Sequence, residues 1–177
     1  MELESIKEQI WDLSLPEVIK LWDGLEKEYG IDAVRELCKV DRYYLLVRAC
    51  GRVDALHPWL YERCREVERR PDDMLDLWAR EHYKSTIITF AGAIQAILRD
   101  PEVTISIFSH TKGIARKFFR QIKYELESNQ VLLKAFPDVL WENVRQAPRW
   151  AEETGLVVKR KNNPKEATLE AWGLVDG

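Results

Sequence analysis

The polar stretch at residues 79–86, Ala-Arg-Glu-His-Tyr-Lys-Ser-Thr, combines residue types that bind phosphate groups. Lys84 can place its ammonium on the β- and γ-phosphates of a nucleotide, and the hydroxyl of Ser85 can coordinate Mg²⁺. Both residues open a segment whose apolar positions have the spacing of one helix face, at residues 87, 90, 91, 94, 97 and 98. A helix start offers unpaired N–H groups and a partial positive charge to an anion. The order of these features predicts a phosphate-binding loop.

The glycines of the standard phosphate-loop pattern, G-x-x-x-x-G-K-[ST], are absent from this stretch. Trp78 stands at the first glycine position and Tyr83 at the second. A positive φ at Tyr83 would be strained, because glycine is the residue that adopts it without steric cost. The alternative interpretation is a helix whose first turn simply carries polar residues. The spacing alone leaves both interpretations open.

The elements that would position the loop are two strands and a helix. An apolar run before the loop (Met74, Leu75, Leu77 and Trp78) predicts a buried strand, and the β-branched residues 103–109 predict a second one. Strand, helix and strand in close succession form a βαβ unit, so we expect an α/β fold with a partial parallel sheet and flanking helices. Residues 156–160 and 167–172 alternate like strands and predict a hairpin that turns at 162–164.

The first seventy residues have the spacing of helices and predict an all-helical N-terminal segment at 1–70, before an α/β domain at 71–177. Ser14-Leu15-Pro16-Glu17 predicts a capping box, and Gly30 predicts a helix end. Asp32 is expected to cap the next helix. The apolar residues 43–47 predict a helix that is buried on most sides.

The loop Ala79-Arg80-x-x-x-Lys84-Ser85-Thr86 resembles the degenerate phosphate loop of terminase large subunits, the motors that package DNA into tailed-phage capsids. Arg80, His82 and Lys84 to Thr86 fit that loop, whereas Glu81 and Tyr83 replace small residues. Ser109-His110-Thr111 before a helix, and a strand pair that ends at Trp172-Gly173, extend the resemblance over residues 57–177. The resemblance implies a partial P-loop NTPase domain that binds ATP and Mg²⁺.

The resemblance also implies roles for individual residues. Lys84 and Arg80 would be catalytic, with Arg80 stabilising charge on the γ-phosphate, and Ser85 would hold the metal. His57 and Trp59 become candidates for the rim of an adenine pocket, although we favour a helix-start histidine and a core tryptophan. Residues 109–112 either contact nucleic acid or the nucleotide site, or cap the next helix. The residues implied to bind the nucleotide are Arg80, Glu81, His82, Tyr83, Lys84, Ser85 and Thr86.

The predicted helix at 112–126 carries cations on one side and is a candidate DNA-binding surface: Lys112, Arg116, Lys117, Arg120 and Lys123. A solvated helix face is the alternative. By resemblance, the partners are double-stranded DNA through the full motor, the small terminase subunit and the portal, with oligomers only in the assembled motor.

Composition excludes several classes of protein. A net charge of -3 argues against a nucleic-acid binder that uses its whole surface. The three cysteines lack C-x-x-C spacing and only three histidines accompany them, so we expect no zinc site and a reducing compartment, the cytoplasm of the host cell. No apolar run approaches the length of a membrane span, so no membrane partner is expected.

The resemblance therefore implies the ATP-binding portion of a packaging motor, and we expect that this chain alone does not hydrolyse ATP. Hydrolysis needs an acid that holds Mg²⁺ at the end of an apolar strand. Asp176 is the late candidate, but Gly173 interrupts its strand, and the chain is expected to stop before the acidic strand of the family. Two alternatives stay open: a non-catalytic module that contacts phage proteins or DNA, and a helicase-like ATPase of another family.

Overall fold

The computed structural model describes residues 6, 9–69, 75–162 and 164–175, and the chain divides into two compact units, Met1–Ala91 and Gly92–Gly177. The sequence suggested a boundary at residue 70, whereas here the candidate phosphate loop belongs to the same unit as the N-terminal helices. None of the described helices combines the length and the apolar character that a membrane span requires.

The described elements of the first unit are all helical, as the periodicity of its first seventy residues predicts. The backbone N–H of Ser14 donates to the Glu17 carboxylate at 2.8 Å, which closes the predicted capping box. Gly30, with φ 56°, ends one helix and begins the next, so Asp32 lies in the first turn and does not cap it. The helices are α2 (Leu15–Tyr29), α3 (Ile31–Val40), α4 (Arg42–Tyr44), the π-helix η1 (Leu45–Ala49), the 3-10 helix η2 (Val53–Ala55), α5 (Pro58–Arg69) and the π-helix η3 (Thr86–Ala91).

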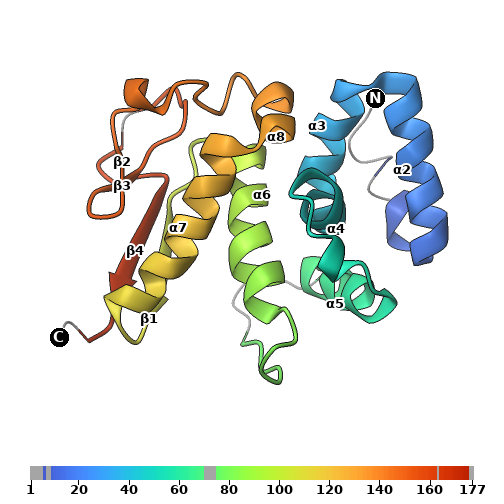
Figure 1. Ribbon diagram of the computed structural model, residues 1–177, viewed down its shortest axis with the longest axis horizontal. Helices are drawn as coiled ribbons and strands as arrows, with labels where there is room; N and C mark the ends of the chain where they lie inside the picture. Colours follow the sequence, from blue (N-terminus) through green and yellow to red (C-terminus); the bar gives the residue numbers. More distant parts are fainter. Residues whose placement is uncertain (1–5, 7–8, 70–74, 163, 176–177) are drawn as a thin grey trace. The chain divides into compact units, whose positions relative to one another are not determined.

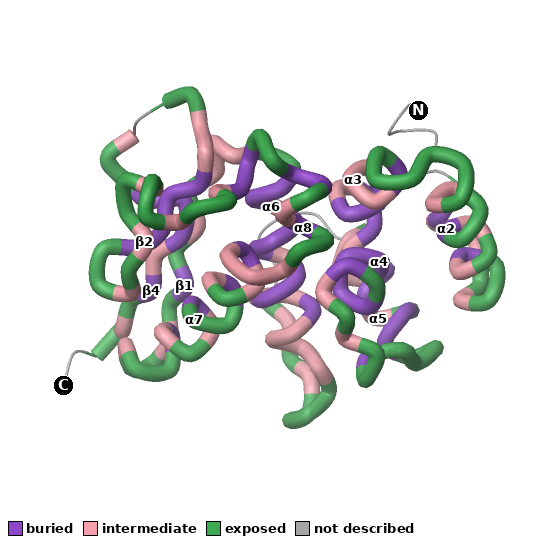
Figure 2. The backbone as a smooth tube through the Cα atoms, turned by 45° about the horizontal axis from the view of Figure 1, so that its top comes forward, coloured by how far each residue is buried: buried purple, intermediate pink, exposed green. Residues whose placement is uncertain are grey.

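A buried carboxylate lies at the centre of the first unit. Asp41 is fully buried and accepts hydrogen bonds from Trp22 Nε1 at 3.0 Å and from the Tyr44 N–H at 3.0 Å. It also pairs with Arg65 Nη2 at 2.8 Å, and Arg65, which is 5% exposed, reaches Glu68 at 3.0 Å through its other terminal nitrogen. Residues 43–47, which span α4 and η1, are all buried, and Figure 2 draws most of this stretch in the colour of buried residues. The prediction of a buried helix at 43–47 is confirmed.

The second unit is a mixed sheet covered by helices. Its strands are β1 (Ile105–Ser109), β2 (Trp150–Ala151), β3 (Gly155–Leu156) and β4 (Leu169–Gly173), in the order β1-β4-β3-β2. β1 and β4 are parallel, whereas β3 pairs antiparallel with both β4 and β2. The helix α7 (Lys112–Ser128) packs across β1 and β4 and buries Ala115, Phe119 and Ile122 (Figure 1). The remaining elements are α6 (Gly92–Arg99), α8 (Gln130–Ala135) and the 3-10 helix η4 (Val144–Gln146).

The strand expected before the phosphate loop is not formed at residues 75–78. Leu75 is 79% exposed and Leu77 is 81% exposed, and Met74 lies outside the described residues. The parallel partner of β1 is β4, so the predicted βαβ unit is wrong. A short apolar run becomes a strand only where another strand offers it hydrogen bonds. The described part of the first unit offers helices alone.

The predicted hairpin is confirmed only at its base, where Leu156 pairs with Leu169. After Leu156 the strand pairing ends: the Val157 N–H donates to the Arg149 carbonyl at 3.0 Å and the Lys159 N–H to the Val139 carbonyl at 2.9 Å. The Val158 N–H reaches Thr168 only through its side-chain hydroxyl, at 3.3 Å. The expected turn is held by Glu102, whose carboxylate accepts from the Lys161 N–H at 2.6 Å. Asn163 lies outside the described residues.

The end of β4 passes very close to the start of α7. A Cβ atom added at Gly173 would lie 2.5 Å from the backbone nitrogen of Lys112, a distance that real side chains do not reach. The N–H groups of Leu174 and Val175 then donate to the carbonyls of Ser109 and His110 at 2.9 and 3.0 Å. Glycine at this position therefore permits the close contact between strand and helix.

We predict that Arg65→Met lowers the free energy of unfolding by about 3 kcal/mol, because it leaves the buried charge of Asp41 without its ion partner. Urea denaturation measures the change. The matched control is Arg63→Met on the same helix, whose ion pair with Glu66 joins side chains that are 35% and 33% exposed. The control should cost less than about 1 kcal/mol. Equal losses for the two variants would contradict a central role for the buried pair.

Candidate functional site

The loop before η3 encloses a hollow of about 360 Å³. All seven residues implied to bind a nucleotide line it, together with Trp78 and Ala79. The chain becomes helical at Lys84, and the Ile87 N–H donates to the Tyr83 carbonyl at 2.9 Å. The N–H groups of residues 84–86 therefore precede the first helical hydrogen bond, where a helix leaves its donors for other acceptors. The structure brings the predicted site residues together on one short segment.

Two residues of the loop have the left-handed backbone conformation that favours glycine. Glu81 has φ 65° and Tyr83 has φ 59°. The strain expected at Tyr83 is therefore present, and a second strained position accompanies it. Each costs about 1–2 kcal/mol relative to an ordinary conformation. Turns of this kind gather successive N–H groups into a concave surface that suits an anion.

Lys84 lies back across the loop, and its Nζ donates to the Asp76 carbonyl at 3.2 Å. An ammonium has three N–H donors, so this bond leaves others for a ligand. Arg80 is exposed, and its guanidinium pairs with none of the described residues. Among those residues no three His, Cys, Asp or Glu side chains gather, so an ion at Ser85 would take its other ligands from phosphate oxygens and water.

The strained Tyr83 is tied to a neighbouring segment that the sequence analysis did not connect with the loop. Its hydroxyl donates to Asp54 Oδ2 at 2.7 Å. The same carboxylate accepts two hydrogen bonds from the guanidinium of Arg52, from Nε at 2.9 Å and from Nη2 at 2.8 Å. The guanidinium of Arg52 lies 5.9 Å from the centre of the Tyr83 ring. We call these three residues the Tyr83 latch. Nothing in the spacing of residues 52, 54 and 83 indicates that they meet.

Within the latch, the carboxylate of Asp54 is ionised at neutral pH. Hydrogen bonds from Arg52 and then from Tyr83 hold the pKa of Asp54 well below its ordinary value of 3.8. A carboxylate whose pKa is lowered by folding contributes stability above its unfolded pKa and loses that contribution as the pH falls through its folded pKa. The carboxylate is therefore ionised above about pH 4, and the latch is lost only at alkaline pH, where the Tyr83 hydroxyl, whose pKa the hydrogen bond to Asp54 raises above its ordinary value of 10.0, gives up its proton.

The ring of Trp59 lies against two rings of the residues that line the hollow, those of Trp78 and His82. The ring of Trp59 is centred 6.1 Å from that of Trp78 and 5.5 Å from that of His82. Trp59 is 38% exposed, so the expectation that it is a core residue is wrong. His57 accepts a hydrogen bond at its Nδ1 from the Trp59 N–H at 3.1 Å, which agrees with the expected helix-start histidine.

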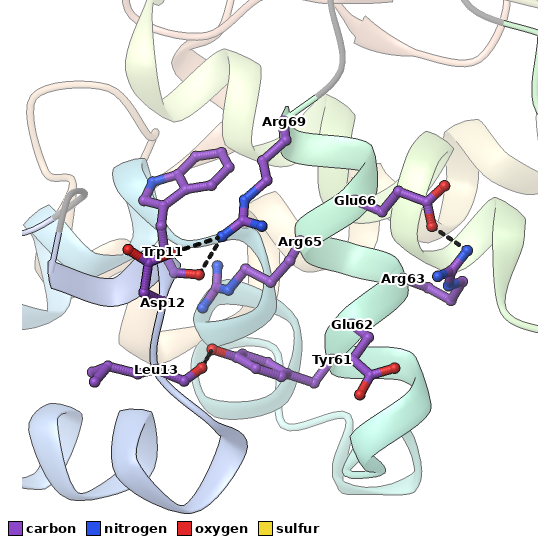
Figure 3. Close-up of a pocket in the computed structure, with 9 residues that line it drawn as sticks. All are labelled: Trp11, Asp12, Leu13, Tyr61, Glu62, Arg63, Arg65, Glu66 and Arg69. Carbon is purple, nitrogen blue, oxygen red and sulfur yellow. Dashed lines mark hydrogen bonds and ion pairs between the residues drawn. The ribbon is translucent and has the colours of Figure 1, made fainter.

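A larger hollow, of about 640 Å³, lies between residues 11–13 and α5 (Figure 3). Its arginines already have partners: Arg63 pairs with Glu66, Arg65 with Asp41 and Glu68, and Arg69 with Asp12 and the Trp11 carbonyl. Because acidic partners already neutralise these arginines, this hollow should attract an anion less strongly than the loop does. We therefore place the candidate site at residues 78–86.

The basic face of α7 is largely covered by acids of the same unit. Arg120 pairs with Glu152 at 2.6 Å, Arg116 with Glu153 at 3.4 Å and Lys123 with Glu127 at 2.7 Å. Lys112 lies 5.7 Å from the centre of the Trp172 ring. These pairs reduce the charge that the face presents to a phosphate backbone, and its affinity for DNA stays a prediction. Thr111 is the N-cap residue of α7 but makes no capping hydrogen bond with its side chain.

If α7 binds DNA, removal of a covering acid should strengthen the interaction. We expect Glu152→Gln to raise the affinity for a DNA duplex, because it releases Arg120 for a phosphate and steepens the salt dependence by about one counterion. Fluorescence anisotropy at several salt concentrations measures both quantities. Glu142→Gln changes the net charge equally at an exposed position and serves as the control. Indistinguishable affinities for the two variants would exclude α7 as the DNA-binding face.

Comparisons with known proteins add no relative of this chain. No family model, no curated protein and no solved structure matches it. Its function must therefore be argued from the geometry of the loop and from the resemblance of its motifs.

Proposed function

We propose that this chain binds ATP with Mg²⁺ through residues 79–86, as the nucleotide-binding portion of a DNA-packaging terminase large subunit. One observation carries the proposal: a strained loop encloses a hollow at a helix start and presents a lysine there. Strain of this kind persists only where the surrounding structure enforces it, and it is concentrated at binding and catalytic sites. A polar first turn without a ligand would not need two left-handed residues before it.

The roles follow from the chemistry of each group. The N–H groups of residues 84–86 and the ammonium of Lys84 bind the β- and γ-phosphates, as donors at a helix start do. Arg80 is exposed at the rim and stabilises charge on the γ-phosphate. Ser85 contributes a hydroxyl to the metal. The carboxylate of Glu81 opposes the phosphates, so we expect weaker binding than a glycine-rich loop gives.

The hollow suits the phosphates better than a whole nucleotide. At about 360 Å³ it is near the lower end for a small-molecule pocket. The base would then lie at the edge of the hollow, against the rings of Trp59, Trp78 and His82. Stacking on aromatic side chains contributes about 1–3 kcal/mol per base. This arrangement favours a nucleotide over a simple anion as the ligand.

Binding without turnover is the activity that we propose for this chain alone. A phosphate-loop NTPase also needs an acid that holds Mg²⁺, and the candidate Asp176 lies outside the described residues. The exposed Leu75 and Leu77 favour the second candidate function, a non-catalytic module, because no strand delivers the loop to a sheet at these residues. The two candidates differ in whether the loop binds ATP.

We predict that Lys84→Ala abolishes the binding of a fluorescent ATP analogue and leaves the melting temperature within a few degrees. The hydrogen bond that Lys84 makes within the protein goes to one backbone carbonyl, so its loss costs only about 1 kcal/mol of stability. The matched control is Lys117→Ala, which removes an exposed lysine from α7. If Lys84→Ala binds the analogue like the wild type, the phosphate-loop assignment is wrong.

A second variant separates the base from the phosphates. Trp59→Ala should weaken ATP binding about tenfold, since loss of a stacking partner costs about 1–3 kcal/mol. Binding of inorganic tripolyphosphate should stay unchanged, because this ligand has no base. Competition against the fluorescent analogue measures both affinities. Equal weakening for the two ligands would show that Trp59 supports the loop and does not contact the base.

A further inference from the structure

A loop without glycines needs another way to keep a left-handed conformation. Rotation of Tyr83 from φ 59° to an ordinary negative value would re-aim residues 79–82 relative to the helix start. The hollow that these residues line would then lose its shape. A stable cradle therefore depends on a contact that fixes the Tyr83 side chain.

The Tyr83 latch supplies that contact, because its three residues restrain one another. The short hydrogen bond between the Tyr83 hydroxyl and Asp54 is charge-assisted, and the fork of Arg52 fixes the carboxylate from the other side. A fork of two N–H donors leaves the carboxylate little freedom to rotate. Tyr83 therefore meets an acceptor whose position is already set.

The latch is anchored to the core of the first unit. Asp54 belongs to η2, and the next residue, Ala55, is fully buried. The hydroxyl of the buried Tyr43 donates to the Ala55 carbonyl at 3.0 Å and accepts from the His57 N–H at 3.1 Å. The ring of Tyr43 packs 5.2 Å from that of Tyr61. Contacts with the core therefore fix η2, and η2 carries the carboxylate of Asp54, which binds the Tyr83 hydroxyl.

We propose that Asp54 is a positioning residue of the nucleotide site, which with Arg52 holds the Tyr83 hydroxyl and so keeps the phosphate loop in its ligand-binding conformation. This inference rests on the proposed function, because it assigns to that site a support that no phosphate-loop motif contains. Asp54 touches no phosphate itself. Its carboxylate would act through the backbone conformation of Tyr83 and the direction of the N–H groups that follow.

A double-mutant cycle tests the inference in the full chain. Asp54→Ala should weaken binding of a fluorescent ATP analogue about tenfold, as the strain of one left-handed residue implies. In a Tyr83→Gly background the same change should have no effect, because glycine needs no latch. Asp32→Ala removes an exposed acid elsewhere in the first unit and serves as the control. Loss of stability alone would not produce this dependence on residue 83.

A second readout needs no nucleotide. Trypsin cleaves after Arg80 and Lys84, so opening of the loop should increase the rate of cleavage at both sites in Asp54→Ala. Tyr83→Phe should give the same increase, since it removes only the hydroxyl and leaves the pair of Arg52 and Asp54 intact. It carries the test if Asp54→Ala fails to fold.

The outcomes separate the two proposals. If Asp54→Ala binds the analogue like the wild type while Lys84→Ala does not, the latch is overturned and the proposed function stands. If the wild type binds no nucleotide, the proposed function fails, and so does the assignment of Asp54 to a nucleotide site. Unchanged tryptic cleavage in both latch variants would overturn even the structural part of the inference.

Discussion

The first unit depends on a charge that has no access to water. Burial of a carboxylate is costly unless donors surround it, and Asp41 receives them from three separate helices: Trp22 of α2, Tyr44 of α4 and Arg65 of α5. These helices must therefore meet in one arrangement. That arrangement also places Tyr43, the neighbour of Tyr44, where its hydroxyl fixes η2. Asp54 of η2 in turn binds Tyr83 of the candidate loop. The position of the loop therefore depends, through η2, on the helix arrangement around the buried carboxylate of Asp41.

A chain can hold a left-handed turn in a polar loop in two ways. Glycine allows a left-handed turn without strain and keeps the loop adaptable. Here Glu81 and Tyr83 take such positions, and the hydroxyl of Tyr83 donates to Asp54, the contact that we infer to keep the turn. In general, a loop that is already shaped before a ligand arrives loses less entropy on binding. The same contacts limit how far the loop can adjust to different ligands.

Much of the local structure follows from the sequence. The capping box at Ser14 and the stop at Gly30 define helix ends by short-range hydrogen bonds, and the β-branched run before Ser109 forms a strand. The residues of the candidate site are contiguous, so the sequence alone could group them. The absence of a strand at 75–78, the exposure of Trp59 and the two acids Glu152 and Glu153 over α7 could not be predicted, since each depends on residues far away in the chain. Glu152, for example, meets Arg120 only because β2 and the turn after it follow the helix surface.

The close passage of Gly173 past the start of α7 has a consequence for the evolutionary history of the chain. A side chain at this position would push the strand and the helix apart, so substitutions there should be eliminated while most surface positions drift. Gly173 is the last residue of β4, and β4 is parallel to β1, the strand that leads into α7. A glycine at this place in the fold would then persist after overall sequence similarity has faded. Distant relatives could be recognised by this one constrained position.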